Sequence, residues 1–220
     1  MTLVAITGAN KGIGLEMTKQ FLERGDDVIA MCRTTSDALQ QTNAQIIEGI
    51  DVGAESCVDI LKDKCAGQNI DYLINNAGIF TNESLEDMDF DRIRMQFEVN
   101  TLGPLRVSLA LLPNLNTGSK VFIVSSRVGS LADNSSGGNY GYRISKTAVN
   151  MAGVNLAHDL KSKEIGVFLL HPGFVRTNMT SGNGNVEPSQ SATNLIDRMD
   201  ALTLEQTGTF WHAEEYELPW

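Results

Sequence analysis

Tyr142 and Lys146 are the residues of this chain whose types and spacing point most directly to chemistry. They stand four positions apart, ahead of an apolar and small-residue run over 148–156 that predicts a long buried helix. Because i and i+4 share a helix face, the phenol and the ammonium can occupy one small volume. A nearby positive charge lowers the pKa of a phenol from its usual ~10, which would suit Tyr142 to general acid–base catalysis. Tyr140, six residues from Lys146, leaves the helix on another side.

A glycine loop near the N-terminus predicts a nucleotide site. The apolar strand expected over 3–7 runs into Thr-Gly-Ala-Asn-Lys-Gly-Ile-Gly, residues 7–14, and a helical pattern follows. Glycines let the backbone approach a pyrophosphate, and the helix N-terminus supplies N–H groups and the positive end of its dipole. The spacing is G-x-x-x-G-x-G and not the commoner G-x-G-x-x-G, so the strand–loop–helix setting carries the prediction.

The residues after the second predicted strand, 27–32, favour NADP over NAD. Many NAD-binding folds carry an acidic residue there to hold the ribose hydroxyls. In this chain Cys32 stands in that place, Arg33 follows it, and Lys11 lies in the glycine loop. Two cations where a 2′-phosphate would sit favour NADP; the alternative for each is a solvated surface charge.

Strands alternating with helices predict an α/β fold: a single-domain, doubly wound parallel sheet over residues 1–220 with helices on both faces. Pro104 should kink the long helix expected over 90–112, which contains Asn100. Ligands on such sheets bind beyond the carboxyl ends of the strands, where these motifs lie. Further strands are expected over 44–49, 70–78, 121–126, 166–173 and 209–212, and further helices over 56–65 and 189–199.

Three other segments border the expected site. Asp51 follows the third strand and could accept from an adenine amino group or cap a turn. Ser125 and Ser126 end the fifth strand, and because neighbouring strand residues face opposite ways, only one should face Tyr142. The glycine- and asparagine-rich segment 180–188 predicts a flexible lid.

Composition excludes several function classes. The 220 residues are 42% hydrophobic and 20% charged, as in ordinary globular proteins. A formal net charge of −10 makes nucleic acid and anionic membranes poor partners. The sequence shows neither an apolar span of ~18 residues nor a signal peptide, so we expect a cytoplasmic protein. Cys32, Cys57 and Cys65 and the three histidines lack metal-ligand spacing, so we expect no metal site and packed, reduced thiols.

Together these motifs resemble the short-chain dehydrogenase/reductase superfamily over nearly the whole chain. The motifs TGANKGIG and SSRVGS, with the C-terminal TGTF…ELPW, look like its bacterial C-factor-like and carbonyl-reductase-like branch. The matching pieces are, in order, Thr7-Gly8-x-x-x-Gly12-Ile13-Gly14, Asp51, Asn75-Asn76-Ala77-Gly78, Asn100, Ser126, Tyr142-x-x-x-Lys146 and Pro172-Gly173-x-Val175-x-Thr177.

The resemblance implies a Rossmann-fold enzyme that reduces an aldehyde or ketone with NADPH. Tyr142 would be the acid–base residue, and Lys146 would lower its pKa and hold the nicotinamide ribose. Ser126 would bond the substrate oxygen, with Ser125 as the fallback, and Asn100 would hold a water linking Lys146 to solvent. A homodimer or tetramer would pair through the helices around 90–112 and 142–162. The implied cofactor-binding residues are Gly8, Asn10, Lys11, Gly12, Ile13, Gly14, Arg33, Asp51, Val52, Asn76, Ala77, Gly78, Asn100, Tyr142, Lys146, Pro172, Gly173, Val175 and Thr177.

The chain departs from the family pattern in two places. The interval from Ser126 to Tyr142 is a few residues longer than usual, and the segment after Thr177 is short, so we expect an open, permissive pocket. Two other functions compete: an NAD(P)-binding signalling protein of C-factor type with little turnover, and a nucleotide-sugar epimerase. Epimerases are much longer and carry a substrate domain, while the intact Ser126, Tyr142 and Lys146 set argues against binding alone.

Overall fold

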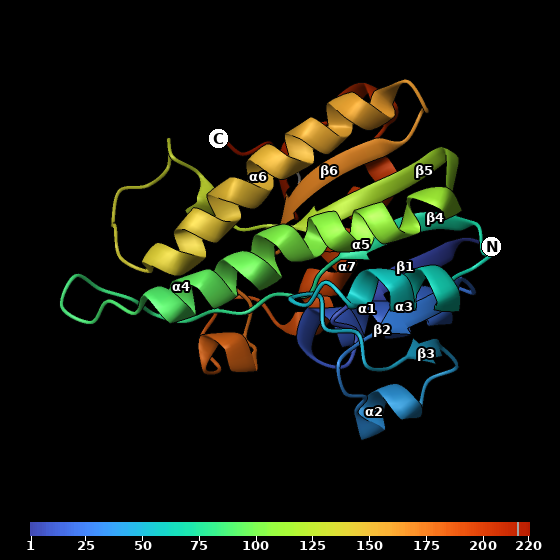
Figure 1. Cartoon of the computed structure of the whole chain (residues 1–220), viewed down its shortest axis with the longest axis horizontal. Helices are drawn as coiled ribbons and strands as arrows, with labels where there is room; N and C mark the ends of the chain where they lie inside the picture. Colours follow the sequence, from blue (N-terminus) through green and yellow to red (C-terminus); the bar gives the residue numbers. More distant parts are fainter. Residues whose placement is uncertain (215) are drawn as a thin grey trace.

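The computed structural model describes residues 1–214 and 216–220, which form one parallel sheet covered by helices on both faces (Figure 1). Within those residues seven strands pair in the order β3-β2-β1-β4-β5-β6-β7, every pair parallel. This confirms the predicted doubly wound α/β fold. The strands are β1 (Leu3–Thr7), β2 (Asp27–Met31), β3 (Gln45–Ile47), β4 (Ile70–Asn75), β5 (Leu115–Val124), β6 (Gly166–His171) and β7 (Phe210–His212).

The helices cover the sheet in two layers because successive strand residues face opposite sides. Val4 and Ile6 of β1 pack in the core beneath α1, α2 and α7, whereas Ala5 packs in the core beneath α3, α5 and α6. Figure 1 shows α4 and α5 nearly in line with each other, beside α6. The helices are α1 (Gly12–Glu23), α2 (Asp37–Gln40), α3 (Cys57–Lys64), α4 (Phe90–Phe97), α5 (Gly103–Leu111), α6 (Tyr140–Lys161) and α7 (Pro188–Ala201).

The strand order places a topological switch between β1 and β4. From β1 the chain builds outward through β2 to the edge strand β3, then returns to lay β4 on the other side of β1. The carboxyl ends of these two strands therefore diverge into loops on opposite sides, which leaves a crevice for a ligand.

The helix predicted over 90–112 is interrupted earlier than expected. A π-helical segment, Glu98–Leu102, separates α4 from α5, and the N–H of the next residue, Gly103, donates to the Glu98 carbonyl. Pro104 has no N–H to donate to the Asn100 carbonyl four residues before it, so a regular α-helix loses a bond there. The irregularity thus lies ahead of the proline and includes Asn100.

Two further differences are local. The four-residue helix α2, which was not predicted, follows Ser36, whose hydroxyl accepts from the Leu39 N–H at 3.2 Å. Strand β5 begins at Leu115, six residues before the predicted start, because Leu115 pairs with Ile70 ahead of a register shift. Among the described residues, no helix has both the length and the apolar character needed to cross a bilayer. The cytoplasmic location stays a prediction.

Candidate active site

The loop between β1 and α1 is folded so tightly that it requires glycine. Gly8 has a φ of +66°, and a Cβ on Gly14 would lie 2.4 Å from the Gly8 carbonyl oxygen. The segment that follows β4, the neighbour of β1 in the sheet, supports this loop. Thr7 Oγ1 accepts from the N–H groups of Asn76 and Ala77, each at 3.0 Å, and Asn76 Nδ2 donates to the Thr7 carbonyl at 3.0 Å. The α1 N-terminus is held at the carboxyl edge of the sheet, where its N–H groups suit a phosphate.

The two predicted cations lie at one end of this cradle. Lys11 is the N-cap residue of α1, and both Lys11 and Arg33 have exposed side chains that border the same cavity. Asn10 Nδ2 donates to the Thr34 carbonyl at 2.8 Å, which fastens the glycine loop to the segment after β2. The arrangement therefore leaves positive charge beside the helix N-terminus, with no acidic residue at the end of β2.

Asp51 and Val52 form the neighbouring wall. Asp51 Oδ1 accepts from the Gly53 N–H at 3.0 Å, so of its two predicted roles the structure contains the turn cap. The residue also borders the cavity, as does Val52. A contact with adenine stays a prediction.

Tyr142 and Lys146 lie in the first turns of α6, at the opposite end of the cavity. Lys146 is 4% exposed, and its Nζ donates to the Val124 main-chain carbonyl at the end of β5, at 2.9 Å. The same nitrogen lies 5.7 Å from the centroid of the Tyr142 ring. Phe80, which sequence reasoning did not single out, packs edge-on against that ring with a centroid separation of 5.2 Å. The predicted juxtaposition of phenol and ammonium is therefore present.

The predicted lowering of the pKa of Tyr142 is wrong for this structure. Burial raises the pKa of Tyr142 to about 12, and a hydrogen bond with the Ser126 side chain lowers it only in part. Burial also lowers the pKa of Lys146 to about 8. The physical reason is that removing the phenol from water penalises its anion, while the ammonium is engaged by a carbonyl. Tyr142 is consequently a protonated phenol at neutral pH.

The two serines after β5 separate as strand alternation predicts. Ser126 bonds the Tyr142 side chain, and its Oγ accepts from the Val128 N–H at 3.4 Å. Ser125 borders the cavity, but its hydroxyl turns away and donates to Asn150 Oδ1 at 2.5 Å, beneath α6. Of the two candidates, Ser126 is the one placed beside the phenol.

The Asn100 side chain joins the segment after β4 to α6. Its Oδ1 accepts from the Ile79 N–H at 2.8 Å, while its Nδ2 donates to the Ile79 carbonyl at 2.9 Å and to Ser145 Oγ at 3.0 Å. A Cβ on Gly78 would lie 3.3 Å from Asn100 Oδ1 and 3.8 Å from Lys146 Nζ, so only glycine leaves this corner open. Because both amide N–H groups are engaged, the water-holding role that the resemblance implies would fall to the main-chain carbonyl of Asn100, and it stays a prediction.

The glycine cradle, its two cations and the pair of Tyr142 and Lys146 border one cavity of about 1070 Å³ along the carboxyl ends of the strands. It extends from the cations of the glycine loop to the phenol of α6, and Ile79, Phe80 and Met179 add apolar surface. The predicted residues on its wall are Gly8, Asn10, Lys11, Gly12, Ile13, Arg33, Asp51, Val52, Asn76, Ala77, Gly78, Tyr142, Lys146, Pro172 and Thr177.

The remaining predicted residues lie behind that wall. Gly14 is buried under the Gly8 turn, and Asn100 and Ser126 support Ile79 and Tyr142 as described. Gly173 has a φ of +90° and turns the chain after β6. Val175 is 4% exposed and forms a bridge with Val186. These residues shape the cavity without lining it.

The predicted lid, 180–188, is the far side of a longer loop. Its two sides are joined where the Arg176 N–H donates to the Val186 carbonyl at 2.9 Å and the Asn185 N–H donates to the Phe174 carbonyl at 2.7 Å. The Arg176 guanidinium borders the cavity and bonds Glu187 at 2.6 Å. Residues of this loop border the cavity, and a Cβ on Gly12 of the glycine cradle would lie 3.6 Å from Thr177 Cγ2. The flexibility of the loop stays a prediction.

Comparison with known proteins matches this chain to one family. The short chain dehydrogenase family model matches residues 2–187. The chain is 42% identical over 226 aligned residues to 1-hydroxy-2-glutathionyl-2-methyl-3-butene dehydrogenase of Rhodococcus sp. (strain AD45), covering 100% of both chains. It is 40% identical over 159 residues to C-signal of Myxococcus xanthus, covering 71% of this chain and 95% of that protein.

A solved structure extends the likeness to three dimensions. The carbonyl reductase Sniffer of D. melanogaster superimposes with a TM-score of 0.92 at 27% sequence identity, covering 100% of both chains. The relatives agree with the branch that the sequence motifs indicate.

Proposed function

Because the chain belongs to the short-chain dehydrogenase/reductase family of oxidoreductases, we propose that it reduces the carbonyl group of an aldehyde or ketone to an alcohol with NADPH. One observation carries the proposal: a proton-donating phenol and a buried ammonium stand at one end of a cavity whose other end is a glycine cradle with two cations. Residues 1–220 would act as one cofactor-binding unit.

The residues present fit a nicotinamide dinucleotide. The cavity, at about 1070 Å³, slightly exceeds the usual range of roughly 300–1,000 Å³ for small-molecule sites, which suits a cofactor and a substrate together. The α1 N-terminus would hold the pyrophosphate, and Lys11 and Arg33 would hold the 2′-phosphate that distinguishes NADPH. When bound, NADPH supplies a hydride to the carbonyl carbon.

Tyr142 would give the carbonyl oxygen its proton while the carbon receives the hydride, so that one hydride and one proton together convert C=O to CH–OH and the phenol is left as phenolate. Its pKa of about 12 keeps the phenol protonated at neutral pH, the state that a general acid needs. Ser126, which bonds the phenol without bordering the cavity, would hold the Tyr142 hydroxyl toward the substrate oxygen. Lys146 would hold the cofactor ribose and place positive charge beside the developing oxyanion.

The substrate class is narrowed by the cavity and by one relative. The cavity wall includes the apolar side chains of Ile79, Phe80 and Met179, and Phe80 packs against Tyr142, so an apolar carbonyl compound would fit. The Rhodococcus relative is named for a glutathione conjugate that bears an alcohol. We therefore include glutathionyl aldehydes among the candidate substrates.

NADPH consumption over a panel of aldehydes, ketones, diketones, quinones and glutathionyl aldehydes tests the proposal. We expect turnover with at least one class and a corresponding alcohol product, with Tyr142→Phe as the inactive control. A protein that binds NADPH tightly but turns over none of the panel contradicts it.

The similarity to C-signal supports a second candidate function, a cofactor-binding signalling protein with little turnover. The two functions differ in one measurable respect. A signalling protein would keep NADPH binding and lose nothing measurable when Tyr142 is replaced by Phe, whereas a reductase would lose its turnover.

We also propose that the protein forms a homodimer or tetramer through α4, α5 and α6. The large apolar side chains Phe90, Leu109, Ile144 and Met151 are exposed on these helices, and between 49% and 64% of each is accessible in the single chain. Burying them against a second copy would remove apolar surface from water.

A further inference from the structure

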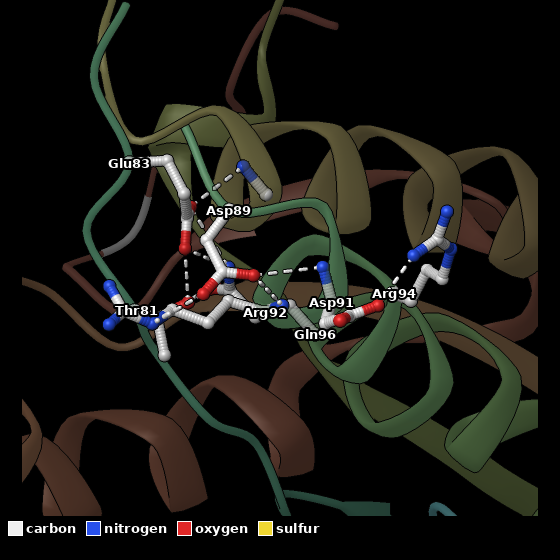
Figure 2. A network of polar contacts seen from close by, with 8 residues as sticks. Thr81, Glu83, Asp89, Asp91, Arg92, Arg94 and Gln96 are labelled. Carbon is white, nitrogen blue, oxygen red and sulfur yellow. Dashed lines mark hydrogen bonds and ion pairs between the residues drawn. The ribbon is translucent and has the colours of Figure 1, made fainter. Parts of the chain in front are cut away.

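Glu83 is a fully buried carboxylate that lies outside the cavity. It belongs to the segment between β4 and α4, and it faces the start of α6. Its exposed fraction is 0%, as is that of Gln96 on α4. Figure 2 shows the two side chains together with Thr81, joined by dashed hydrogen bonds. Burying a carboxylate is unfavourable unless several hydrogen-bond donors satisfy it, so the donors that hold Glu83 indicate what the carboxylate fixes in place.

The donors to Glu83 come from three elements. The Gly141 N–H donates to Oε2 at 3.1 Å, Gln96 Nε2 donates to both carboxylate oxygens at 3.2 and 3.3 Å, and the Thr81 hydroxyl donates to Oε1. Gln96 Oε1 in turn accepts from the Thr81 N–H at 3.0 Å. The result is a chain of bonds from Thr81 through Gln96 and Glu83 to Gly141.

Donor and acceptor counting fixes which side chain is the carboxylate. Both ends of the chain of bonds are main-chain N–H groups, so both terminal side-chain atoms must be acceptors. Gln96 offers one acceptor and one donor, so Glu83 must accept at both of its atoms. With glutamine at position 83, an NH₂ group replaces one carboxylate oxygen: at Oε2 it faces the Gly141 N–H, and at Oε1 it faces Gln96 Nε2 and must take the Thr81 hydroxyl as its acceptor. Either way, at least one of the present bonds is lost.

This chain of bonds ends one residue before Tyr142. α6 begins at Tyr140, and among the described residues its N-cap, Asn139, makes no side-chain cap bond. Glu83 therefore provides, from a distant segment, the acceptor that a local cap would offer to the first turn. It also places a negative charge at the positive end of the helix dipole.

Gly141 allows the close approach. A Cβ there would lie 2.2 Å from Gln96 Nε2 and 3.0 Å from Glu83 Oε2, so a side chain on Gly141 would displace the pair. On the other side, Thr81 follows Phe80, whose ring packs against Tyr142. The same chain of bonds thus fixes both the backbone beneath the phenol and the segment that holds its aromatic neighbour.

We propose that Glu83, acting through Gln96 and Gly141, is a positioning residue that holds the first turn of α6 and thereby aims the Tyr142 hydroxyl into the cavity. It is not a catalytic residue, since it borders neither the cavity nor the phenol oxygen. Its effect on turnover rests on the proposed reductase function, whereas its effect on the order of the first turn does not.

The test compares three variants with the full-length protein. Glu83→Gln keeps the shape but places an NH₂ group against either the Gly141 N–H or Gln96 Nε2. The double variant Glu83→Gln with Gln96→Glu reverses the pair. Residue 96 then accepts from the Thr81 N–H and from the amide of residue 83, the oxygen of that amide accepts from Gly141, and the Thr81 hydroxyl turns to accept from the same amide, so each N–H group again has an acceptor. Glu86→Gln, the same change at an exposed position three residues away, is the matched control.

Two readouts are taken on each variant that shows a cooperative thermal transition. Hydrogen exchange of peptides spanning 139–146 should quicken roughly 10-fold in Glu83→Gln, because the Gly141 N–H exchanges a charged acceptor for a neutral amide oxygen, or faces the amide NH₂ and has no acceptor. With the best panel substrate, kcat should fall roughly 10- to 100-fold, the usual effect of a misplaced reacting group, while the Kd for NADPH stays within about twofold. The reversed pair should restore both readouts to within about threefold, and Glu86→Gln should change neither.

The outcomes separate this inference from the proposed function. Wild-type exchange and kcat in Glu83→Gln would overturn the inference, and so would a folded reversed pair that restores neither readout. If neither variant folds, the pair is a general folding element and the inference is also overturned. If the exchange pattern appears as expected but the wild-type protein reduces no carbonyl, the reductase proposal fails while the control of the first turn stands.

Discussion

The two reaction directions should respond differently to pH because of the pKa of Tyr142. Reduction uses the phenol as a proton donor, whereas alcohol oxidation needs the phenolate as acceptor. With the pKa raised by burial to about 12, about one molecule in 10⁵ carries the phenolate at pH 7, and about one in 10³ at pH 9. We therefore expect kcat for oxidation to rise about tenfold per pH unit over about pH 6 to 9, while proton donation in reduction is unaffected.

Lys146 adds a second effect at higher pH. Burial lowers its pKa to about 8, so the ammonium that would hold the cofactor ribose is progressively lost above that value. The kcat/KM for NADPH in reduction should fall above about pH 8, even though the phenol remains protonated.

The assay measures initial rates of oxidation and of reduction on one alcohol–carbonyl pair as a function of pH, at constant ionic strength. The cofactor is saturating wherever kcat values are compared. Tyr140→Phe, which removes the other phenol of the same turn, should leave the profile unchanged. An oxidation rate that reaches its plateau below about pH 9 would refute the reasoning, since it would mean that the Lys146 charge outweighs burial at Tyr142.

Three further outcomes are expected. NADPH should be preferred to NADH, and equal kcat/KM for the two cofactors in the unmutated protein would contradict this. Arg33→Asp should lower kcat/KM for NADPH about tenfold. This is the low end of the effect of a charge-assisted contact, because the Arg33 side chain is exposed and its charge is screened by salt. Ser126→Ala should lower kcat and shift the pH dependence of the oxidation rate to higher pH, because it removes the hydrogen bond that lowers the pKa of Tyr142. Ser125→Ala should retain turnover, because the Ser125 hydroxyl bonds Asn150 instead. Light scattering should give at least twice the 23.9 kDa mass of one chain, and a single mass near that of one chain at high concentration would refute the proposed pairing through α4, α5 and α6.

The sheet could be predicted from the sequence because each strand is a short apolar run that ends in glycine or polar residues. The run over 3–7 and the glycines that follow it specify β1, the loop and α1 by local rules alone. The i, i+4 spacing of Tyr142 and Lys146 likewise depends only on helix geometry, and strand alternation separates Ser125 from Ser126.

What the sequence did not reveal depends on contacts between distant segments. The sign of the pKa shift of Tyr142 is set by burial, which no local spacing reports. The bonds that Glu83 makes join positions 81, 96 and 141, and no periodic pattern marks any of them as partners. The π-helical segment around Asn100 arises where Pro104 removes a donor, and the sequence signalled the kink but not its exact place.

The central claim is that the Tyr142 hydroxyl gives the proton, and Tyr142→Phe tests it most directly because only that oxygen is removed. The decisive measurement is kcat with the best carbonyl substrate, taken beside a fluorescence titration with NADPH. The account predicts a fall in kcat of roughly 10²- to 10⁴-fold, the usual contribution of a positioned general acid, with NADPH affinity preserved because the glycine loop and Lys146 are intact. A variant that binds NADPH equally well and keeps most of its turnover would contradict the account.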